Sequence, residues 1–293
     1  MEVIESEDKS FNKHILQEGT GEKLINEGSL VKVYICCIDN PDMDKDLLGN
    51  YTLNEYFDVT IGEAESSIAE LLDKILITMK EGERAYVKTK MDQSGNLTSK
   101  SITHDSLNLK KTESDCLLKF QISVQSVTRS ADISDLEADE RIERAEHYKE
   151  KGSILYKNNN LTFAVKKYRN SIKYLTSIPE ESLPKIPEKL RQEFRRLVLL
   201  NHLNLALCFW KIEEWDLVLK HCDEALSLDP NNVKALYRRA QGYSNKYNYE
   251  AALKDLNSIL KIEEGNKAAL KDIKIISAKK QQEKDMYKKM FNS

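Results

Sequence analysis

Four side chains in the second half of the chain could together bind a carboxylate group. They are Lys149, Asn204, Lys234 and Arg238. Lys234 and Arg238 are four residues apart and would therefore share one face of a helix. Ammonium, guanidinium and amide N–H groups donate hydrogen bonds to carboxylates, and charge-assisted bonds contribute roughly 1.5–3 kcal/mol each. The residue types predict a site for an acidic ligand, provided that the fold brings the four side chains together.

The segment that carries three of these side chains repeats with a period of 34 residues. Between Leu203 and Ile262 the matched pairs are Ala206 and Ala240, Phe209 and Tyr243, Trp215 and Tyr249, and Leu228 and Ile262. Small residues at repeated positions let two helices approach closely. Pro230 stands where a helix should stop. The pattern predicts helical hairpins that stack on one another.

This period and these residue types are the signature of the tetratricopeptide repeat, a family that the chain resembles. Gly152, Ala164 and Tyr168 show the same spacing upstream. We expect three repeats, at about 145–178, 199–232 and 233–266, with about twenty residues between the first and the second. One repeat cannot bury its own apolar face, so the three should stack into a superhelix. A helix at 267–291 should cap it.

The first helix of each repeat would line the concave wall of this superhelix. All four donor residues fall on first helices, and we expect Lys234 and Arg238 to be exposed on the groove wall. The arrangement resembles the carboxylate clamp of co-chaperones. That resemblance implies binding of the acidic C-terminal tail of heat-shock protein 90, or of heat-shock protein 70. The predicted peptide-binding residues are Lys149, Ser153, Tyr156, Asn204, Lys234, Arg238 and Gln241.

Three of these residues, Ser153, Tyr156 and Gln241, were not among the four donors named first, and each would have a different role. Ser153 takes the place of a second polar clamp residue, as a shorter donor. Tyr156 could wall an apolar side chain of the peptide, and Gln241 could add an amide. One alternative for the repeats stays open, a scaffold for an unrelated internal peptide. Isolated cations such as Lys246 and Lys254 are expected to be solvated surface.

The C-terminal segment KKQQEKDMYKKMF is basic and carries Met286, Met290 and Phe291 near its end. Basic amphipathic helices can bind calmodulin. The preferred interpretation is a capping helix whose apolar residues cover the last repeat.

Composition restricts the class of protein. The chain has 293 residues, 32% charged and 40% hydrophobic, which suits a soluble protein with room for two domains. Residues 1–130 carry a net charge of −8 and residues 131–293 one of +5. The basic half is too weakly charged for a nucleic-acid site.

Neither a cofactor nor a metal is expected, because the five cysteines have no zinc-site spacing. We expect Cys208 and Cys222 to be buried thiols. The N-terminus is acidic and unlike a signal peptide, and no apolar run is long enough to span a membrane. These features favour a cytoplasmic protein, also in the nucleus, with no membrane partner.

The first half alternates apolar and polar residues over several short stretches that predict strands. One amphipathic helix is expected, with Ile68, Leu71, Leu72, Ile75 and Met79 on one face. Residues 1–12 read as a polar end, 40–50 and 92–114 as loops, and Ser134 with Glu137 as a capping box. The fold class is α+β: residues 1–130 form an antiparallel sheet with one helix, and residues 131–293 form an all-α repeat domain.

The order of these elements resembles the FK506-binding (tacrolimus-binding) prolyl isomerase domain of the immunophilins. The segments that carry the resemblance are LQEGTGEKLINEGSLVKVYI, FDVTIGE, MKEGERAYV and LLKFQISVQSV. An isomerase of this family encloses a prolyl ring in an aromatic pocket. Here the positions of the pocket Tyr and Trp correspond to about Ile35 and Leu72, and Tyr34 is one residue out of phase. The Phe-Asp pair and a Tyr-containing loop at 92–114 are missing.

These departures predict an isomerase-like domain without activity, so the chain is expected not to be an enzyme. Tyr56 and Phe57 are interpreted as strand residues rather than as pocket residues. The predicted function is that of a co-chaperone adaptor: the repeats bind the chaperone tail and the first domain binds an unknown client. An active peptidyl-prolyl isomerase is the alternative from another class.

Overall fold

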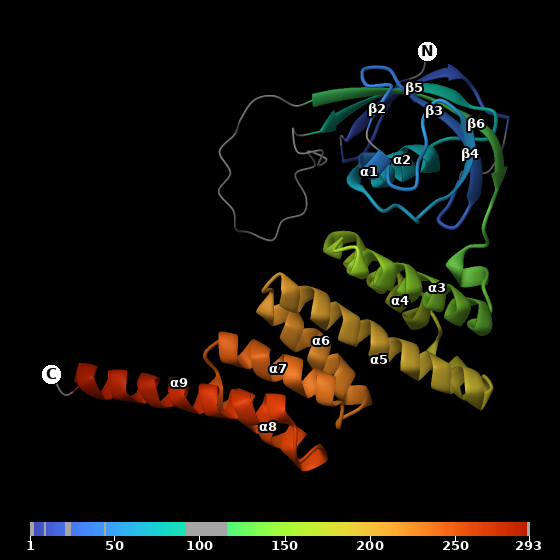
Figure 1. Ribbon diagram of the computed structural model, residues 1–293. Helices are drawn as coiled ribbons and strands as arrows, with labels where there is room; N and C mark the ends of the chain where they lie inside the picture. Colours follow the sequence, from blue (N-terminus) through green and yellow to red (C-terminus); the bar gives the residue numbers. More distant parts are fainter. Residues whose placement is uncertain (1–2, 9, 21–24, 44, 92–115, 292–293) are drawn as a thin grey trace. The chain divides into compact units, whose positions relative to one another are not determined.

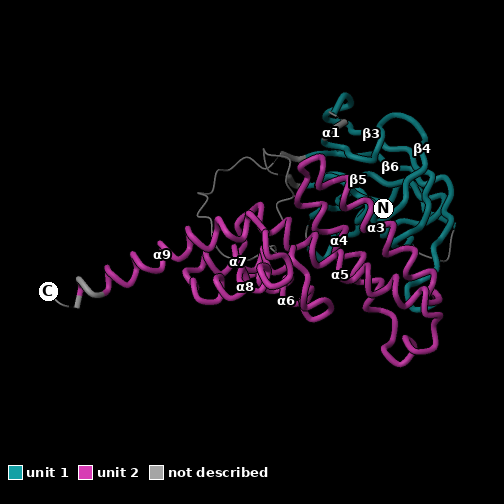
Figure 2. Tube along the Cα trace, turned by 60° about the horizontal axis from the view of Figure 1, so that its bottom comes forward, with its two compact units in different colours: residues 1–135 teal, residues 136–293 magenta. Residues whose placement is uncertain are grey.

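The computed structural model describes the chain except for residues 1–2, 9, 21–24, 44, 92–115 and 292–293. The chain forms two compact units, Met1–Asp135 (unit 1) and Leu136–Ser293 (unit 2), shown in Figure 2. The predicted loop at 92–114, where an aromatic loop was sought, lies outside the described residues.

Unit 1 contains one antiparallel sheet of six strands in the order β1-β2-β5-β6-β3-β4 (Figure 1). The strands are β1 (Val3–Glu5), β2 (Phe11–Gln17), β3 (Leu30–Cys37), β4 (Tyr56–Thr60), β5 (Arg84–Met91) and β6 (Cys116–Thr128). Alternation decides which face of each strand is buried. In β3 the residues Val31, Val33, Ile35 and Cys37 are fully buried.

Helix α2 (Ser67–Ile77) covers the inner face of this sheet (Figure 1). Ser66 caps it by accepting a hydrogen bond from the Ala69 backbone N–H, at 3.0 Å. All five apolar residues predicted for its buried face are at most 2% exposed. The sequence missed two elements. A short helix, α1 (Lys45–Leu48), lies in the predicted 40–50 loop, and β1 lies in the supposed polar end.

Unit 2 consists of seven α-helices in the described part of the chain, arranged as three hairpins and a last helix (Figure 1). They are α3 (Ala138–Lys157), α4 (Leu161–Thr176), α5 (Glu188–Lys211), α6 (Trp215–Leu228), α7 (Val233–Asn245), α8 (Tyr249–Ile262) and α9 (Lys267–Phe291). Helix α5 begins about three turns earlier than the predicted repeat. Half of the expected spacer is therefore the start of this helix, and the 3-10 helix Glu180–Lys185 forms most of the rest.

Small residues allow the helices to pack closely. Ala206 and Ala240 are fully buried, as are the thiols of Cys208 and Cys222. A Cβ atom added at Gly152 would lie 2.8 Å from the ring of Tyr168. The small residues of the repeat pattern therefore lie where the paired helices leave no room for a larger side chain.

The predicted capping box at the start of unit 2 is wrong in its residues. Glu137 is the N-cap of α3, and the Glu140 carboxylate accepts a hydrogen bond from the Glu137 backbone N–H at 2.9 Å. Ser134 instead belongs to the preceding 3-10 helix, Ile133–Asp135. The box is thus shifted three residues along the chain.

Candidate peptide-binding site

Helices α3, α5 and α7 are the first helices of the three hairpins. Helix α5 contacts both α3 and α7, so the three lie side by side in this order. Lys149 lies on α3, Asn204 on α5, and Lys234 and Arg238 on α7. This is the placement that the repeat pattern predicts. The four residues differ, however, in how free their side chains are.

Lys234 and Asn204 have donors available for a ligand. Lys234 is exposed, and it makes no hydrogen bond or ion pair with the residues that the structure describes. Asn204 is half-buried on α5, and its amide likewise has no partner within the described ranges. A half-buried amide with unused N–H groups is a suitable donor to a carboxylate.

Arg238 is half-buried, which corrects the expectation that it is exposed like Lys234. Its Nη1 donates a hydrogen bond to the backbone carbonyl of Leu203 at 2.7 Å. Burial lowers the pKa of the Arg238 guanidinium, but an arginine stays charged at neutral pH. Arg238 therefore ties α7 to α5, and it can serve a ligand only with its remaining N–H groups.

Lys149 and Ser153 both have partners within unit 2. The Lys149 ammonium forms an ion pair with Glu146, one turn earlier, at 2.6 Å. The Ser153 hydroxyl donates to the Lys149 carbonyl at 2.9 Å and lies 3.3 Å from the Tyr168 hydroxyl. Ser153 thus uses its single hydroxyl hydrogen inside the helix, so the predicted donor role would require its hydroxyl to rotate.

Tyr156 lies beside two cations. The Lys211 ammonium is 4.4 Å from the centre of the Tyr156 ring, and Arg238 is close enough to interact electrostatically with Tyr156. Lys211 was missed in the sequence, although it lies seven residues after Asn204 and therefore on the same face of α5. A cation over an aromatic ring is stabilised by about 0.5–1 kcal/mol at exposed sites.

Gln241 is held by the last helix. Its Nε2 donates to Asp272 of α9 at 2.6 Å, and the Tyr237 hydroxyl donates to the same carboxylate oxygen at 2.7 Å. Burial and Asp272 raise the pKa of Tyr237 to about 12, so this hydroxyl remains a donor at neutral pH. Asp272 could not be assigned from the sequence, because its contact joins residues about thirty positions apart.

In unit 1 the positions of the expected isomerase pocket belong to the core. Ile35 and Leu72 are fully buried. Tyr34 lies on the opposite face of β3, with its ring 5.4 Å from that of Tyr56. Phe57 is partly buried and packs against the core, as expected for a strand residue.

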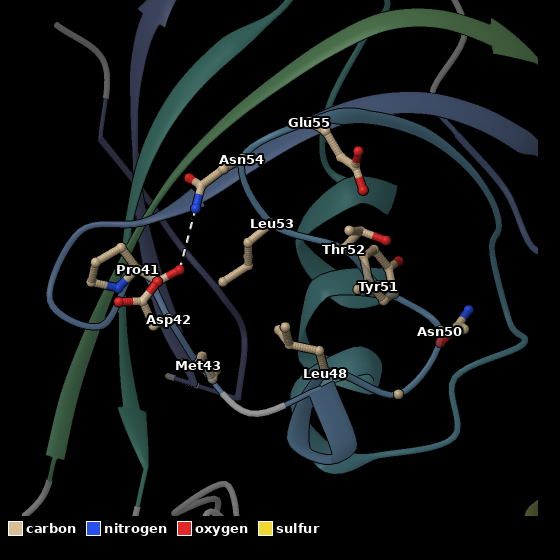
Figure 3. Close-up of a pocket in the computed structure, with 11 residues that line it drawn as sticks. Pro41, Asp42, Met43, Leu48, Asn50, Tyr51, Thr52, Leu53, Asn54 and Glu55 are labelled. Atoms are coloured by element: carbon tan, nitrogen blue, oxygen red, sulfur yellow. Dashed lines mark hydrogen bonds between the residues drawn. The ribbon is translucent and has the colours of Figure 1, made fainter.

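A cavity of about 730 Å³ lies in unit 1, beneath the segment 41–55 (Figure 3). Leu48 and Leu53 point toward its centre in this view. Tyr51 lines the cavity, and its hydroxyl donates to the buried Asp73 at 2.5 Å. Burial and the Asp73 charge raise the pKa of Tyr51. The segment is therefore fixed by a buried hydrogen bond.

Metal centres and membrane-spanning helices each require a recognisable arrangement of residues. Within the described residues no group of three or more His, Cys, Asp and Glu side chains is arranged to hold a metal ion. The described helices include none that is both long and apolar enough to cross a membrane.

Two curated relatives match nearly the whole chain. "Peptidyl-prolyl cis-trans isomerase FKBP4" from Bos taurus is 26% identical over 300 residues, covering 99% of this chain and 60% of that protein. "FK506-binding protein 59" from Drosophila melanogaster is 24% identical, covering 98% of this chain and 60% of that protein. The chain therefore spans about three fifths of the length of these relatives. No protein-family model matches it.

One solved structure supports the fold. The crystal structure of residues 1–211 of CG17282 superposes with a TM-score of 0.56 at 16% sequence identity, covering 73% of this chain and 96% of that one. At this level of identity the match shows a shared fold and nothing more.

The relatives correct one prediction. The chain was expected not to be an enzyme, but the Bos taurus relative that it resembles is named as a peptidyl-prolyl cis-trans isomerase, and this similarity points to an isomerase rather than away from one. The order of strands and helices and the names of both relatives agree with the resemblance seen in the sequence. Over nearly its whole length the chain is therefore similar to FK506-binding immunophilins, and in this chain the helical repeat unit follows the sheet-containing unit.

Proposed function

We propose that the chain is a co-chaperone that binds the acidic C-terminal tail of heat-shock protein 90, or of heat-shock protein 70, through unit 2. The observation that carries this proposal is the exposed Lys234 on α7, which has no partner among the described residues and lies one turn from Arg238. The neighbouring helix α5 carries Asn204, whose amide is likewise unused within the described ranges. An exposed cation alone is ordinary surface. A cation grouped with free amide and guanidinium donors is suited to a carboxylate.

Each donor would contact a different group of the peptide. Lys234 and Lys149 would contact carboxylates of the peptide from α7 and α3. Asn204 would donate to the terminal carboxylate from α5, and the free N–H groups of Arg238 would meet an acidic side chain. Tyr156, held by Lys211, would contact an apolar side chain of the peptide.

Calorimetric titration with the acidic C-terminal peptide of heat-shock protein 90 tests this proposal. The peptide should bind, and the same peptide with an amidated C-terminus should bind at least about tenfold more weakly, because one charge-assisted contact is lost. Equal binding of the two peptides would contradict the clamp and favour a scaffold for internal peptides.

Prolyl isomerisation by unit 1 is the second candidate function. The name of the Bos taurus relative favours it, and segment 41–55 lines a half-open cavity of about 730 Å³ in unit 1. A proline-isomerisation assay on the full chain, with and without tacrolimus, tests it. Acceleration that tacrolimus removes would assign the activity to unit 1, and an unchanged uncatalysed rate would contradict it.

The client, the choice between the two chaperones and a cytoplasmic location that extends to the nucleus stay predictions. Calmodulin binding by the end of α9 stays the less favoured alternative to its capping role. Met286 and Tyr287 there are 63% and 55% exposed. The expected capping role is supported for the first half of α9, where Ala269 and Ile276 are buried against α8 and its neighbours.

A further inference from the structure

The carboxylate of Glu146 holds one of the predicted clamp cations. Its Oε1 accepts from the Lys149 ammonium at 2.6 Å, and its Oε2 accepts from Nη2 of Arg196 on α5 at 3.0 Å. Both oxygens of Glu146 are thus occupied by cations from two first helices. Lys149 differs in this respect from Lys234, which has no such partner among the described residues.

A second carboxylate, that of Glu193, belongs to the same cluster and interacts with Lys149 only through space. Glu193 bonds Arg196 through both of its oxygens, at 2.5 and 2.8 Å. No bond joins Glu193 to Lys149 in the part of the chain that the structure describes. The cluster therefore contains two glutamates of equal charge, of which Glu146 forms the direct ion pair with the clamp lysine and Glu193 acts on it from farther away.

We infer that Glu146 is an internal competitor of the peptide carboxylate, and that an acidic peptide must displace it from Lys149 in order to bind fully. This inference rests on the proposed function. Two carboxylates that approach one ammonium repel each other, and the repulsion is stronger in a partly desolvated groove than in water. The Lys149 side chain is 15% exposed and that of Glu146 is 29% exposed, so solvent screens the pair incompletely.

The competition makes Glu146 a specificity-determining residue. A ligand with a single carboxylate gains little at Lys149, because it replaces one ion pair with another of the same kind. A peptide that also reaches Asn204, Lys234 and Arg238 gains contacts that Glu146 does not oppose. The groove should therefore favour peptides with several acidic groups over isolated carboxylates.

The test compares Glu146→Gln with Glu193→Gln in the full chain. Both changes remove one negative charge from the same cluster and keep the shape of the side chain. By titration with the acidic C-terminal peptide of heat-shock protein 90, E146Q should bind about two- to fivefold more tightly than the parent, the range expected for one partly exposed ion pair. E193Q should gain clearly less than E146Q, because Glu193 is not bonded to Lys149 and acts on it only through space.

A double variant identifies the mechanism. In the Lys149→Ala background, E146Q should give no gain in affinity, because the lysine that it would release is absent. Thermal midpoints of all variants check the fold, and Glu146→Ala replaces E146Q if the midpoint of E146Q falls.

Three results would overturn the inference. E146Q could bind no more tightly than the parent, E193Q could give the same gain, or the gain could persist without Lys149. Absence of peptide binding by the parent and by every variant is a different outcome, because it would contradict the proposed function itself and leave no competition for Glu146 to exert.

Discussion

Lys234 and Arg238 lie one turn apart, yet truncating them should have different consequences. Arg238 bonds the Leu203 carbonyl, so its removal would break a hydrogen bond between α7 and α5 and loosen the contact of these helices. Loss of binding in an Arg238 variant would therefore mix affinity with stability. Lys234 is exposed and unpaired within the described residues, so a change there reports binding alone.

Lys234→Ala should weaken binding of the acidic chaperone peptide by about tenfold or more, since one charge-assisted contact is lost. The thermal midpoint should stay that of the parent. Lys254→Ala is the matched control, because Lys254 lies on α8, a second helix. Titration calorimetry measures both. Equal affinity of the Lys234 variant and the parent would contradict the clamp.

A pair of histidines, the buried His221 and the half-buried His202, should make the stability of unit 2 depend on pH. Nδ1 of His202 and Nδ1 of His221 are 3.1 Å apart, and the His221 ring stacks on Phe209. Burial lowers the pKa of both, that of His221 to about 4, and the charges of Lys220 and Arg169 add to the effect at His221. Both rings are therefore neutral in the folded protein at pH 7.

Because the folded pKa is lowered, the unfolded chain binds protons first as the pH falls. The stabilisation is present above the ordinary histidine pKa of about 6.5 and is lost progressively toward pH 4. His221→Phe removes this titration while keeping an aromatic ring against Phe209. Its thermal midpoint should fall less between pH 7 and pH 5 than that of the parent. Parallel curves would show that the pair does not control acid stability.

At the scale of elements, the close approach of α3 and α4 depends on a glycine. Gly152→Ala would place a methyl group 2.8 Å from the Tyr168 ring, so one of the two helices must shift. Overpacking of this kind costs about 1–3 kcal/mol, which lowers the thermal midpoint. Gly265→Ala is the control, because an added Cβ there meets nothing within 4 Å. A Gly152 variant as stable as the control would contradict the packing.

The elements were largely predictable because their signals are local. The 34-residue period located α5 to α8, and the apolar face of α2 identified its buried side. Prediction failed where the period is interrupted. Residues 188–198 carry no repeat match, yet they form the start of α5, because that helix is longer than its counterparts.

For the candidate site, the sequence predicted which helices carry the residues but not what each side chain contacts. Spacing correctly placed Lys149, Asn204, Lys234 and Arg238 on the first helices of the hairpins. It could not show that Glu146 holds Lys149, nor that Arg238 bonds the Leu203 carbonyl. Those partners depend on side-chain directions and on contacts between helices, which a one-dimensional pattern does not encode.

At the scale of the whole molecule, the predicted functions fall on different units. All seven predicted peptide-binding residues belong to Leu136–Ser293. A fragment of residues 136–293 should therefore bind the acidic peptide with the affinity of the full chain, within about twofold, and should not catalyse prolyl isomerisation. Titration of both proteins checks the first outcome. A much weaker fragment would mean that unit 1 contributes to the peptide site.

A peptide that contacts α3, α5 and α7 at the same time would link the three repeats to one another. In a stack of hairpins each unit contacts only its neighbours, so an end can open while the middle stays folded. A ligand that needs all three first helices stabilises only those states in which none has opened. Amide hydrogens of α3 and α7, which can exchange independently in the free protein, would then exchange together in the complex. The chaperone tail would thus determine how cooperatively its partner unfolds.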